Sequence, residues 1–81
     1  MTFEFTVTDP EGIHARPAGV IVAAAKAAGV PIKITKGAKT VEAKKLFALM
    51  GLGIKNGETI TVSCDDDAAG EAFKKVLEEN C

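Results

Sequence analysis

Apolar and polar residues alternate in three stretches of the chain, which is the period of a β-strand with one buried face. The apolar positions of these stretches are Phe3, Phe5 and Val7, then Ile32 and Ile34, and finally Ile60, Val62 and Cys64. A fourth, short strand is predicted over residues 39–43, and the tight turn that Gly37 allows joins it to the second strand in a hairpin. The predicted sheet therefore has one apolar face and one polar face.

Three other segments have the composition and spacing of helices. An alanine-rich segment over residues 15–28 ends at Gly29 and Pro31, and a shorter one is predicted over residues 44–52. The last helix follows three aspartates that can cap it, and its apolar stripe consists of Ala69, Phe73, Val76 and Leu77. The order βαββαβα predicts an α+β fold of two layers, with the helices covering only the apolar face of the sheet. Without any linker or repeat, residues 1–81 are expected to form a single domain.

Length and composition narrow the class of protein. A chain of 81 residues with 47% hydrophobic residues is enough for one small domain but not for a deep cleft between two lobes. No apolar run of about 18 residues is present, and residues 1–9 lack the features of a signal peptide, so we expect a cytoplasmic protein. Two cysteines fit that compartment. Cys64 is expected in the core, and Cys81 is expected to be an exposed thiol.

Charge is unevenly distributed although the net charge is −1. Residues 1–12 carry three acids and no base, residues 13–55 carry eight bases and one acid, and residues 56–81 carry two bases and seven acids. A basic middle favours an anionic target, although solvated surface lysines are the simpler explanation. Nucleic acid is not an expected partner, because the chain has no Trp or Tyr and few aromatic side chains to stack on bases.

Most catalytic and metal-binding patterns are missing from the sequence. One histidine and two distant cysteines do not make a metal site, and the single serine, Ser63, lies in a predicted strand without a nucleophile elbow. The glycines of residues 51–57 have the wrong spacing for a phosphate loop and lead into a strand. Residues 65–67 are better explained by helix capping than by a cation site.

The segment Gly12-Ile13-His14-Ala15-Arg16-Pro17-Ala18 is the best candidate for chemistry. Proline is tolerated in a first helical turn, so Pro17 indicates that a helix starts here and that His14 lies at its N-terminus. Free backbone N–H groups at that position favour an anion, and the positive end of the helix dipole favours the neutral imidazole. Arg16 can bind a phosphoryl group through two or more hydrogen bonds. These groups together suit a phosphoryl group carried on a ring nitrogen, although a lone histidine near a helix start is often only a cap or a surface residue.

This segment resembles the active-site segment of the HPr family, the histidine-containing phosphocarrier proteins of the bacterial sugar phosphotransferase system. Residues 43–53, AKKLFALMGLG, are similar to the second-helix segment of the same family, and the chain length and element order agree. The resemblance implies an open-faced sandwich of four antiparallel strands under three helices. It also implies that His14 accepts a phosphoryl group on Nδ1 from Enzyme I and passes it to a IIA domain. Such a protein is a stoichiometric carrier, not an independent enzyme, and it uses no cofactor and no metal.

By the same analogy, partners dock on the first and second helices. The residues expected on that surface are Val20, Leu46, Phe47 and Met50, with Lys26, Lys44 and Lys45 steering acidic partners. Core packing is the alternative for Leu46 and Leu49. At least one of Phe47 and Met50 is expected outside the core, because a short amphipathic helix cannot bury its whole circumference.

One position departs from the family pattern. Lys45 stands where many members from Gram-positive bacteria have a regulatory serine, so no role in catabolite repression through that serine is expected. Two alternatives stay open: a regulatory docking module on the same fold, and a carrier in a nitrogen- or kinase-linked branch. The simplest oligomeric state is a monomer.

Overall fold

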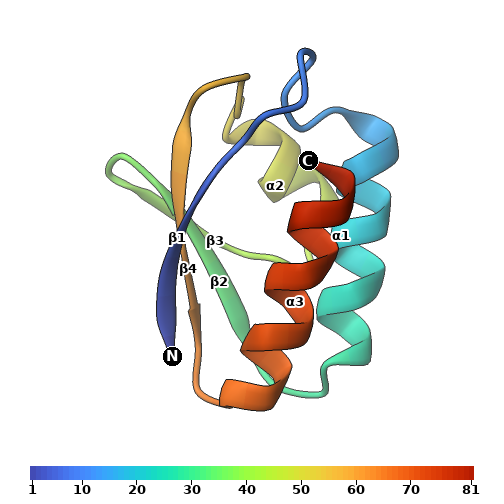
Figure 1. The fold of residues 1–81 in the computed structure, drawn as a ribbon, viewed down its shortest axis with the longest axis vertical. Coiled ribbons are helices and arrows are strands. Elements are labelled where there is room, and N and C mark those ends of the chain that lie inside the picture. Colours follow the sequence, from blue (N-terminus) through green and yellow to red (C-terminus); the bar gives the residue numbers. More distant parts are fainter.

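A four-stranded antiparallel sheet forms one layer of the molecule and three helices form the other, in the computed structural model, which describes residues 1–81 (Figure 1). The strands lie in the order β1-β4-β2-β3. Their bounds are β1 Thr2–Thr6, β2 Ile32–Lys36, β3 Lys39–Glu42 and β4 Thr59–Cys64, and the helices are α1 Ala15–Ala27, α2 Leu46–Gly51 and α3 Asp67–Asn80. The predicted order βαββαβα and the open-faced sandwich are confirmed. None of the three helices is both long and apolar enough to cross a membrane.

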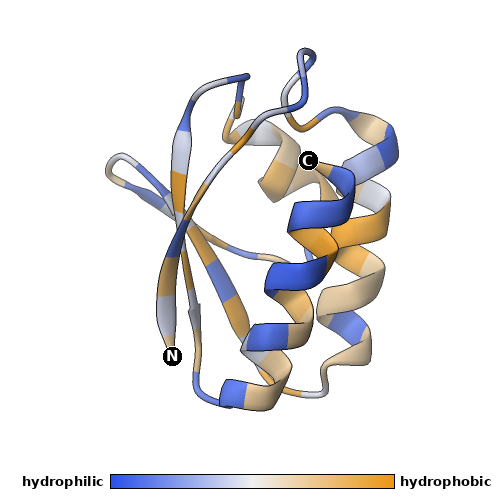
Figure 2. Cartoon of the chain, viewed as in Figure 1, coloured by the Kyte–Doolittle hydropathy of each residue, from blue (hydrophilic) through white to orange (hydrophobic).

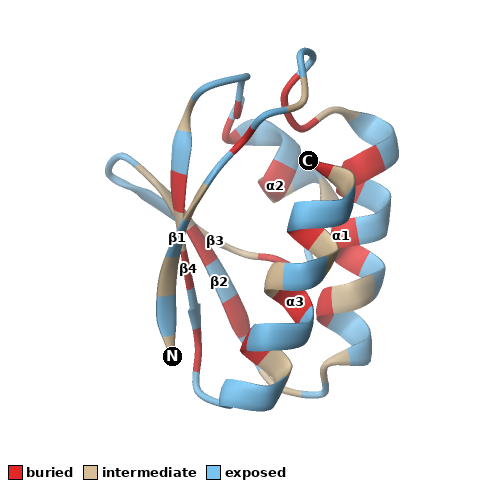
Figure 3. Cartoon of the chain, in the orientation of Figure 1, coloured by how far each residue is buried: buried red, intermediate tan, exposed pale blue.

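The core lies between the sheet and the helices, and the other face of the sheet is open to water. Ile34, Ile60 and Val62 on the inner face are completely buried, and they pack with Phe73 and Leu77 of α3. Orange bands in Figure 2 and red bands in Figure 3 recur along the strands and helices and mark the hydrophobic and the buried residues. Positions on the outer face carry mostly hydroxyl and charged side chains: Thr2, Glu4, Thr6, Lys33, Thr35, Thr40, Thr61 and Ser63.

Helix ends follow the predicted signals. Gly29 has a φ of +71°, a conformation that glycine adopts freely, and it follows the last turn of α1. The Asp66 carboxylate accepts a hydrogen bond of 2.9 Å from the Ala69 N–H, so this aspartate caps α3 as expected.

Two elements are shorter than the sequence suggests. The β1 strand ends at Thr6, although Val7 continues inward and is completely buried. The α2 helix begins at Leu46 because Lys45 has an extended backbone. The Lys45 N–H donates to the Glu42 carbonyl in a turn that precedes the helix. The spacing of apolar side chains does not predict where these two elements begin or end, because backbone hydrogen bonds in the adjoining turns determine those positions.

The loop before α1 is fixed by contact with residues 54 and 55, which precede β4. Gly12 has a φ of +69°, and a Cβ atom there would lie 2.4 Å from the Ile54 carbonyl oxygen and 2.7 Å from the Lys55 Cα. One residue later, the Ile13 N–H donates to the Ile54 carbonyl at 3.0 Å. Gly12 thus permits the close approach of two backbones immediately before His14.

The expectation of an exposed thiol at Cys81 is wrong. Cys81 is 6% exposed, and its backbone oxygen accepts hydrogen bonds from the N–H groups of Thr8 and Asp9 and from the Thr8 hydroxyl. These bonds hold the end of α3 against the loop before α1, which draws the thiol into the core. Burial, and to a smaller extent the Asp9 carboxylate, raises the pKa of the Cys81 thiol to about 11. Cys64 is buried as predicted.

Both thiols should therefore react slowly in the native protein. At pH 8, a thiol with a pKa near 11 is ionised in roughly one molecule in a thousand, and the thiolate is the reactive form. We expect iodoacetamide to label Cys81 at least about 100-fold more slowly than in denaturant, and to label Cys64 slowly because that side chain is buried, as followed by mass spectrometry. Rapid labelling of one thiol under native conditions would contradict its burial.

Substitution Gly12→Ala should destabilise the fold. Alanine disfavours a positive φ, and its Cβ would overlap backbone atoms that cannot turn away, so we expect a loss of about 2–4 kcal/mol in the free energy of unfolding. Gly19→Ala is the matched control, because Gly19 is helical with open space around it. The control should change stability by at most about 1 kcal/mol, in the stabilising direction. Urea denaturation of both variants measures the difference, and equal midpoints would show that Gly12 is not required.

Candidate functional site

His14 is the N-cap residue of α1, and its ring is unbonded. The backbone there is extended, with φ −104° and ψ −172°, and the side chain makes no capping hydrogen bond. The residue is half-buried. Both ring nitrogens are thus free of partners within the chain, and a bond to phosphorus requires that one of them be free.

Two backbone N–H groups beside the ring have no acceptor. The first helical hydrogen bond of α1 runs from the Ala18 N–H to the His14 carbonyl at 2.9 Å, so the amides of Ala15 and Arg16 precede the helical ladder. Pro17 has no N–H and, as the third residue of α1, lies buried in the first turn. These two amides and the positive end of the helix dipole can bind the oxygens of a small anion next to the imidazole.

Arg16 is exposed and takes part in none of the ion pairs of the chain. Its side chain borders a shallow depression that Asp9 and Glu79 also line. A guanidinium without a fixed carboxylate partner is available to bind a phosphoryl group. Positions 14 to 16 therefore supply a nucleophilic ring, two amides and a cation within one turn.

The three large apolar side chains that are exposed all lie on α1 and α2. They are Val20, which is 40% exposed, Phe47, which is 86% exposed, and Met50, which is 38% exposed. Leu46 is half-buried and packs against the core, and Leu49 is buried, so core packing accounts for Leu49 and for part of Leu46. An exposed phenylalanine on a short helix is typical of a surface that meets a partner.

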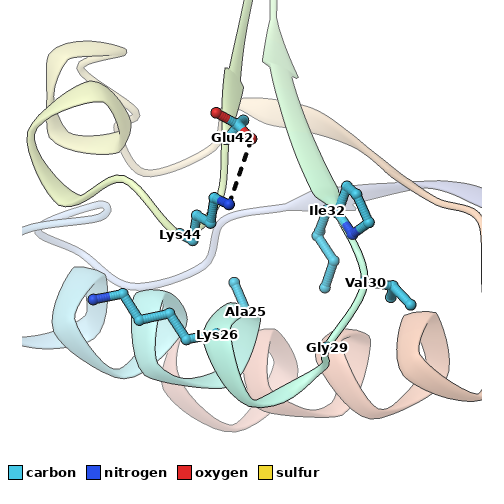
Figure 4. A pocket seen from close by; sticks show the side chains of 8 residues that line it. Ala25, Lys26, Gly29, Val30, Ile32, Glu42 and Lys44 are labelled. Carbon is cyan, nitrogen blue, oxygen red and sulfur yellow. Dashed lines mark ion pairs between the residues drawn. The ribbon is translucent and has the colours of Figure 1, made fainter.

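The structure does not bring Val20 and Lys26 to the same side of α1. Six residues separate them, which corresponds to about 120° around a helix. Val20 borders the depression that contains Glu79 and Asn80 of α3. Lys26 borders a hollow on the other side, with Glu42 and Lys44 on the opposite wall (Figure 4). Val20 and Lys26, both expected on the docking surface, therefore lie on different sides of α1, with Val20 next to α3.

A stripe of small residues between His14 and Lys26 escaped the sequence analysis. Ala15, Gly19 and Ala23 are exposed, and together with Lys26 they recur at spacings of four, four and three, which places them on one face of α1. Since the opposite side of α1 borders α3, this stripe lies on the side of α2. The signal in the sequence is that no large side chain occurs along this helical face before Lys26.

Lys45 precedes α2 as its N-cap residue, and its ammonium group is 2.9 Å from a carboxylate oxygen of Glu42. The hydrogen bond from Lys45 and the charge of its ammonium hold the pKa of the Glu42 carboxyl below its usual value. The positive charge at the start of α2 is thus partly neutralised by a neighbour, while 62% of the Lys45 side chain stays exposed.

The hollow shown in Figure 4, about 450 Å³ in volume, lies at the C-terminal end of α1. A helix of 13 residues is about 20 Å long, so this hollow is far from His14. Its Lys44 pairs with Glu42 at 3.9 Å, and the carbonyl end of α1 borders it, so the hollow does not favour an anion. The site at His14 is shallow and open instead.

Comparisons with known proteins identify the family to which the chain belongs. Residues 1–79 match the family model "PTS HPr component phosphorylation site". The phosphocarrier protein HPr of Lysinibacillus sphaericus is 40% identical over 96% of this chain and 92% of its own, and that of Streptomyces coelicolor is 42% identical over 82% of this chain and 72% of its own. A solved histidine-containing phosphocarrier protein of a mycoplasma superposes with a TM-score of 0.92 at 32% identity, over 98% of this chain and 93% of the other. By its sequence match over nearly every residue and by its fold, this chain belongs to the HPr family of phosphocarrier proteins of the phosphotransferase system.

Proposed function

We propose that this protein receives a phosphoryl group on Nδ1 of His14 from phosphorylated Enzyme I and passes it to IIA domains of the phosphoenolpyruvate-dependent sugar phosphotransferase system. The family and the fold support a phosphocarrier role in that system. The observation that carries the assignment to His14 is its unbonded ring at the N-cap of α1, beside two amides without acceptors. In this proposal residues 1–81 act as one HPr-like domain, a cytoplasmic monomer that needs no cofactor.

The chemistry assigned to each group follows from the transfer of a phosphoryl group. A lone pair of the neutral imidazole forms the nitrogen–phosphorus bond while the bond between phosphorus and the donor breaks, and the bonding electrons leave with the donor. Charge accumulates on the three oxygens of the group in transit. The amides of Ala15 and Arg16 and the Arg16 guanidinium donate hydrogen bonds to these oxygens. His14 is thus the phosphorylated residue, Arg16 stabilises the phosphate and Pro17 shapes the first turn.

A carrier must also release its phosphoryl group. The Arg16 side chain is exposed and the depression beside it is shallow. Hydrogen bonds and ion pairs to exposed groups contribute little in water, so the phosphorylated state is stabilised only weakly until a partner excludes the solvent. The low stability of the free phosphorylated form favours transfer in the next encounter.

We assign partner docking to the surface formed by Phe47 and Met50 on α2 and by the stripe of Ala15, Gly19 and Ala23 on α1. Small side chains next to His14 let a partner approach the ring closely, and Phe47 offers a large apolar side chain at the border. Lys26 and Lys45 add positive charge that steers acidic partners. Leu46 contributes its exposed part, and Val20 is left outside this surface.

Regulation through a serine at the start of α2 is not part of the proposal. Lys45 occupies that position and pairs with Glu42, so a serine kinase has no hydroxyl to modify there. A regulatory docking module on the same fold, or a carrier in a nitrogen- or kinase-linked branch, is the second candidate. The unpaired Arg16 favours a carrier, since docking alone does not require a free guanidinium beside a free imidazole.

Incubation with phosphoenolpyruvate and Enzyme I should add one phosphoryl group to the protein. Intact mass spectrometry should detect this group as an acid-labile modification, and His14→Ala should abolish it. Arg16→Ala should reduce the transfer rate about 10- to 100-fold, because a charge-assisted contact in the transition state is lost. Its melting temperature should stay nearly unchanged, since Arg16 is exposed and unpaired.

Three outcomes would count against the carrier. Absence of any mass change with a cognate Enzyme I would favour the docking module. A modification that survives in His14→Ala would place the phosphoryl group elsewhere. A large loss of stability in Arg16→Ala would show that Arg16 is structural.

Phe47→Ala should weaken docking without changing chemistry. We expect the concentration of carrier that half-saturates Enzyme I to rise about tenfold, which corresponds to about 1.4 kcal/mol, while the saturating rate is kept. Val20→Ala is the matched control, because Val20 is an exposed apolar residue on the other side of α1. Steady-state phosphorylation kinetics measure both constants. Equal effects of the two substitutions would argue against the assigned surface.

A further inference from the structure

The loop that connects α2 to β4 supports the segment that carries His14. The Ile54 carbonyl accepts from the Ile13 N–H at 3.0 Å, and Gly12 packs directly on the peptide that follows Ile54. Ile13 and Ile54 are both buried, 7% and 3% exposed. The position of His14 therefore depends on where this loop, residues 52–58, holds the Ile54 carbonyl.

One lysine ties this loop together from the end of β2. The Lys36 ammonium donates to the carbonyl oxygens of Leu52 at 3.1 Å and Gly53 at 2.9 Å, and it lies 3.0 Å from a carboxylate oxygen of Glu58. Its side chain is 26% exposed, against 56% and 62% for the paired lysines Lys44 and Lys45. Lys36 is thus the lysine with three fixed partners, and all three belong to the loop.

Glu58 closes the same loop from its other end. The carboxylate oxygen that faces Lys36 also accepts from the Lys55 N–H at 2.7 Å. The hydrogen bond from Lys36, followed by that from the Lys55 N–H, holds the pKa of the Glu58 carboxyl below its usual value. Glu58 is therefore ionised at neutral pH, and the ion pair is present under the conditions in which a carrier works.

We propose that Lys36 is a positioning residue for phosphoryl transfer, because it fixes the two ends of the 52–58 loop and so holds the Ile54 carbonyl that orients the backbone of Ile13 and His14. This inference rests on the proposed function of His14. Nothing in the 12–18 segment indicates it, because Lys36 lies 22 positions after His14 in the chain.

The same contacts link the docking helix to the phosphorylated residue. Leu52 is the C-cap of α2, the helix that carries Phe47 and Met50. The Lys36 ammonium group therefore holds the C-terminal end of α2 and also the loop whose Ile54 carbonyl accepts from the Ile13 N–H. A partner seated on α2 therefore meets His14 at a constant distance, which transfer between two bound groups requires.

Lys36→Met tests the inference, because methionine keeps an unbranched stem and removes all three contacts. We expect the saturating rate of phosphorylation by Enzyme I to fall about tenfold, with little change in the half-saturating concentration, since geometry and not docking is altered. Lys33→Met is the matched control, because Lys33 is an exposed lysine on the outer face of the same strand. It should retain the wild-type saturating rate.

Amide hydrogen exchange adds a readout that does not involve Enzyme I. In Lys36→Met, the Ile13 N–H should exchange at least about tenfold faster than in the wild type, while the Val62 N–H in the central strand β4 keeps its rate. A rise in both rates would report general destabilisation, and it would overturn the positioning role. Faster exchange of the Ile13 N–H without any loss of transfer rate would also overturn it. A change in the half-saturating concentration alone, with the saturating rate unchanged, would do the same.

Two further variants keep the test decisive if Lys36→Met does not fold. Glu58→Gln retains an oxygen for the Lys55 N–H but removes the charge that faces Lys36, and it should reduce the saturating rate about threefold. Lys36→Arg keeps a cationic donor and should restore most of the rate. Wild-type rates in Glu58→Gln together with an inactive Lys36→Arg would overturn the inference. Failure of the wild-type protein to accept any phosphoryl group would instead refute the proposed function, and Ile13 exchange would still decide whether Lys36 holds the loop.

Discussion

A single backbone contact, between residues 12–13 and residue 54, determines the geometry of the candidate site. Gly12 must have no side chain there, because the Ile54 carbonyl would lie within 2.4 Å of a Cβ atom. That approach directs the chain into α1 with His14 as its N-cap, and it leaves the amides of Ala15 and Arg16 free. A shift of this contact would move the ring and both amides together, so the site behaves as one rigid unit on the surface of the core.

Elements of the fold were predictable because each has its own pattern in the sequence. Alternation of Phe3 and Phe5 or of Ile60 and Val62 requires one wet and one dry face, and Gly29 with Pro31 ends α1 whatever lies beside it. The ends of β1 and α2 could not be predicted in the same way. They depend on a turn at Glu42 and Lys45 and on contacts between segments that lie far apart in the sequence.

In the candidate site, too, the features that follow from local sequence were predictable and those that depend on packing were not. His14, Arg16 and Pro17 are neighbours in the chain, so their grouping at a helix start follows from local rules of helix capping. The position of Val20 next to Glu79 and Asn80 depends on how α1 is rotated against α3, and no local pattern fixes that rotation. Burial of Cys81 likewise results from hydrogen bonds to Thr8 and Asp9, more than 70 positions earlier.

A phosphoryl carrier has two requirements that oppose each other, and the structure meets them with different parts of the chain. In the proposed function, release requires weak binding, which an exposed Arg16 at a shallow surface would provide. Accurate transfer requires a fixed ring, which strong contacts to the phosphoryl group would otherwise supply. Under our proposals, the backbone that carries the ring is held from behind, by the Ile13–Ile54 hydrogen bond and the Lys36–Glu58 pair, and neither would contact the phosphoryl group. In this proposal the rigidity of the backbone at His14 does not depend on the affinity of the site for the phosphoryl group.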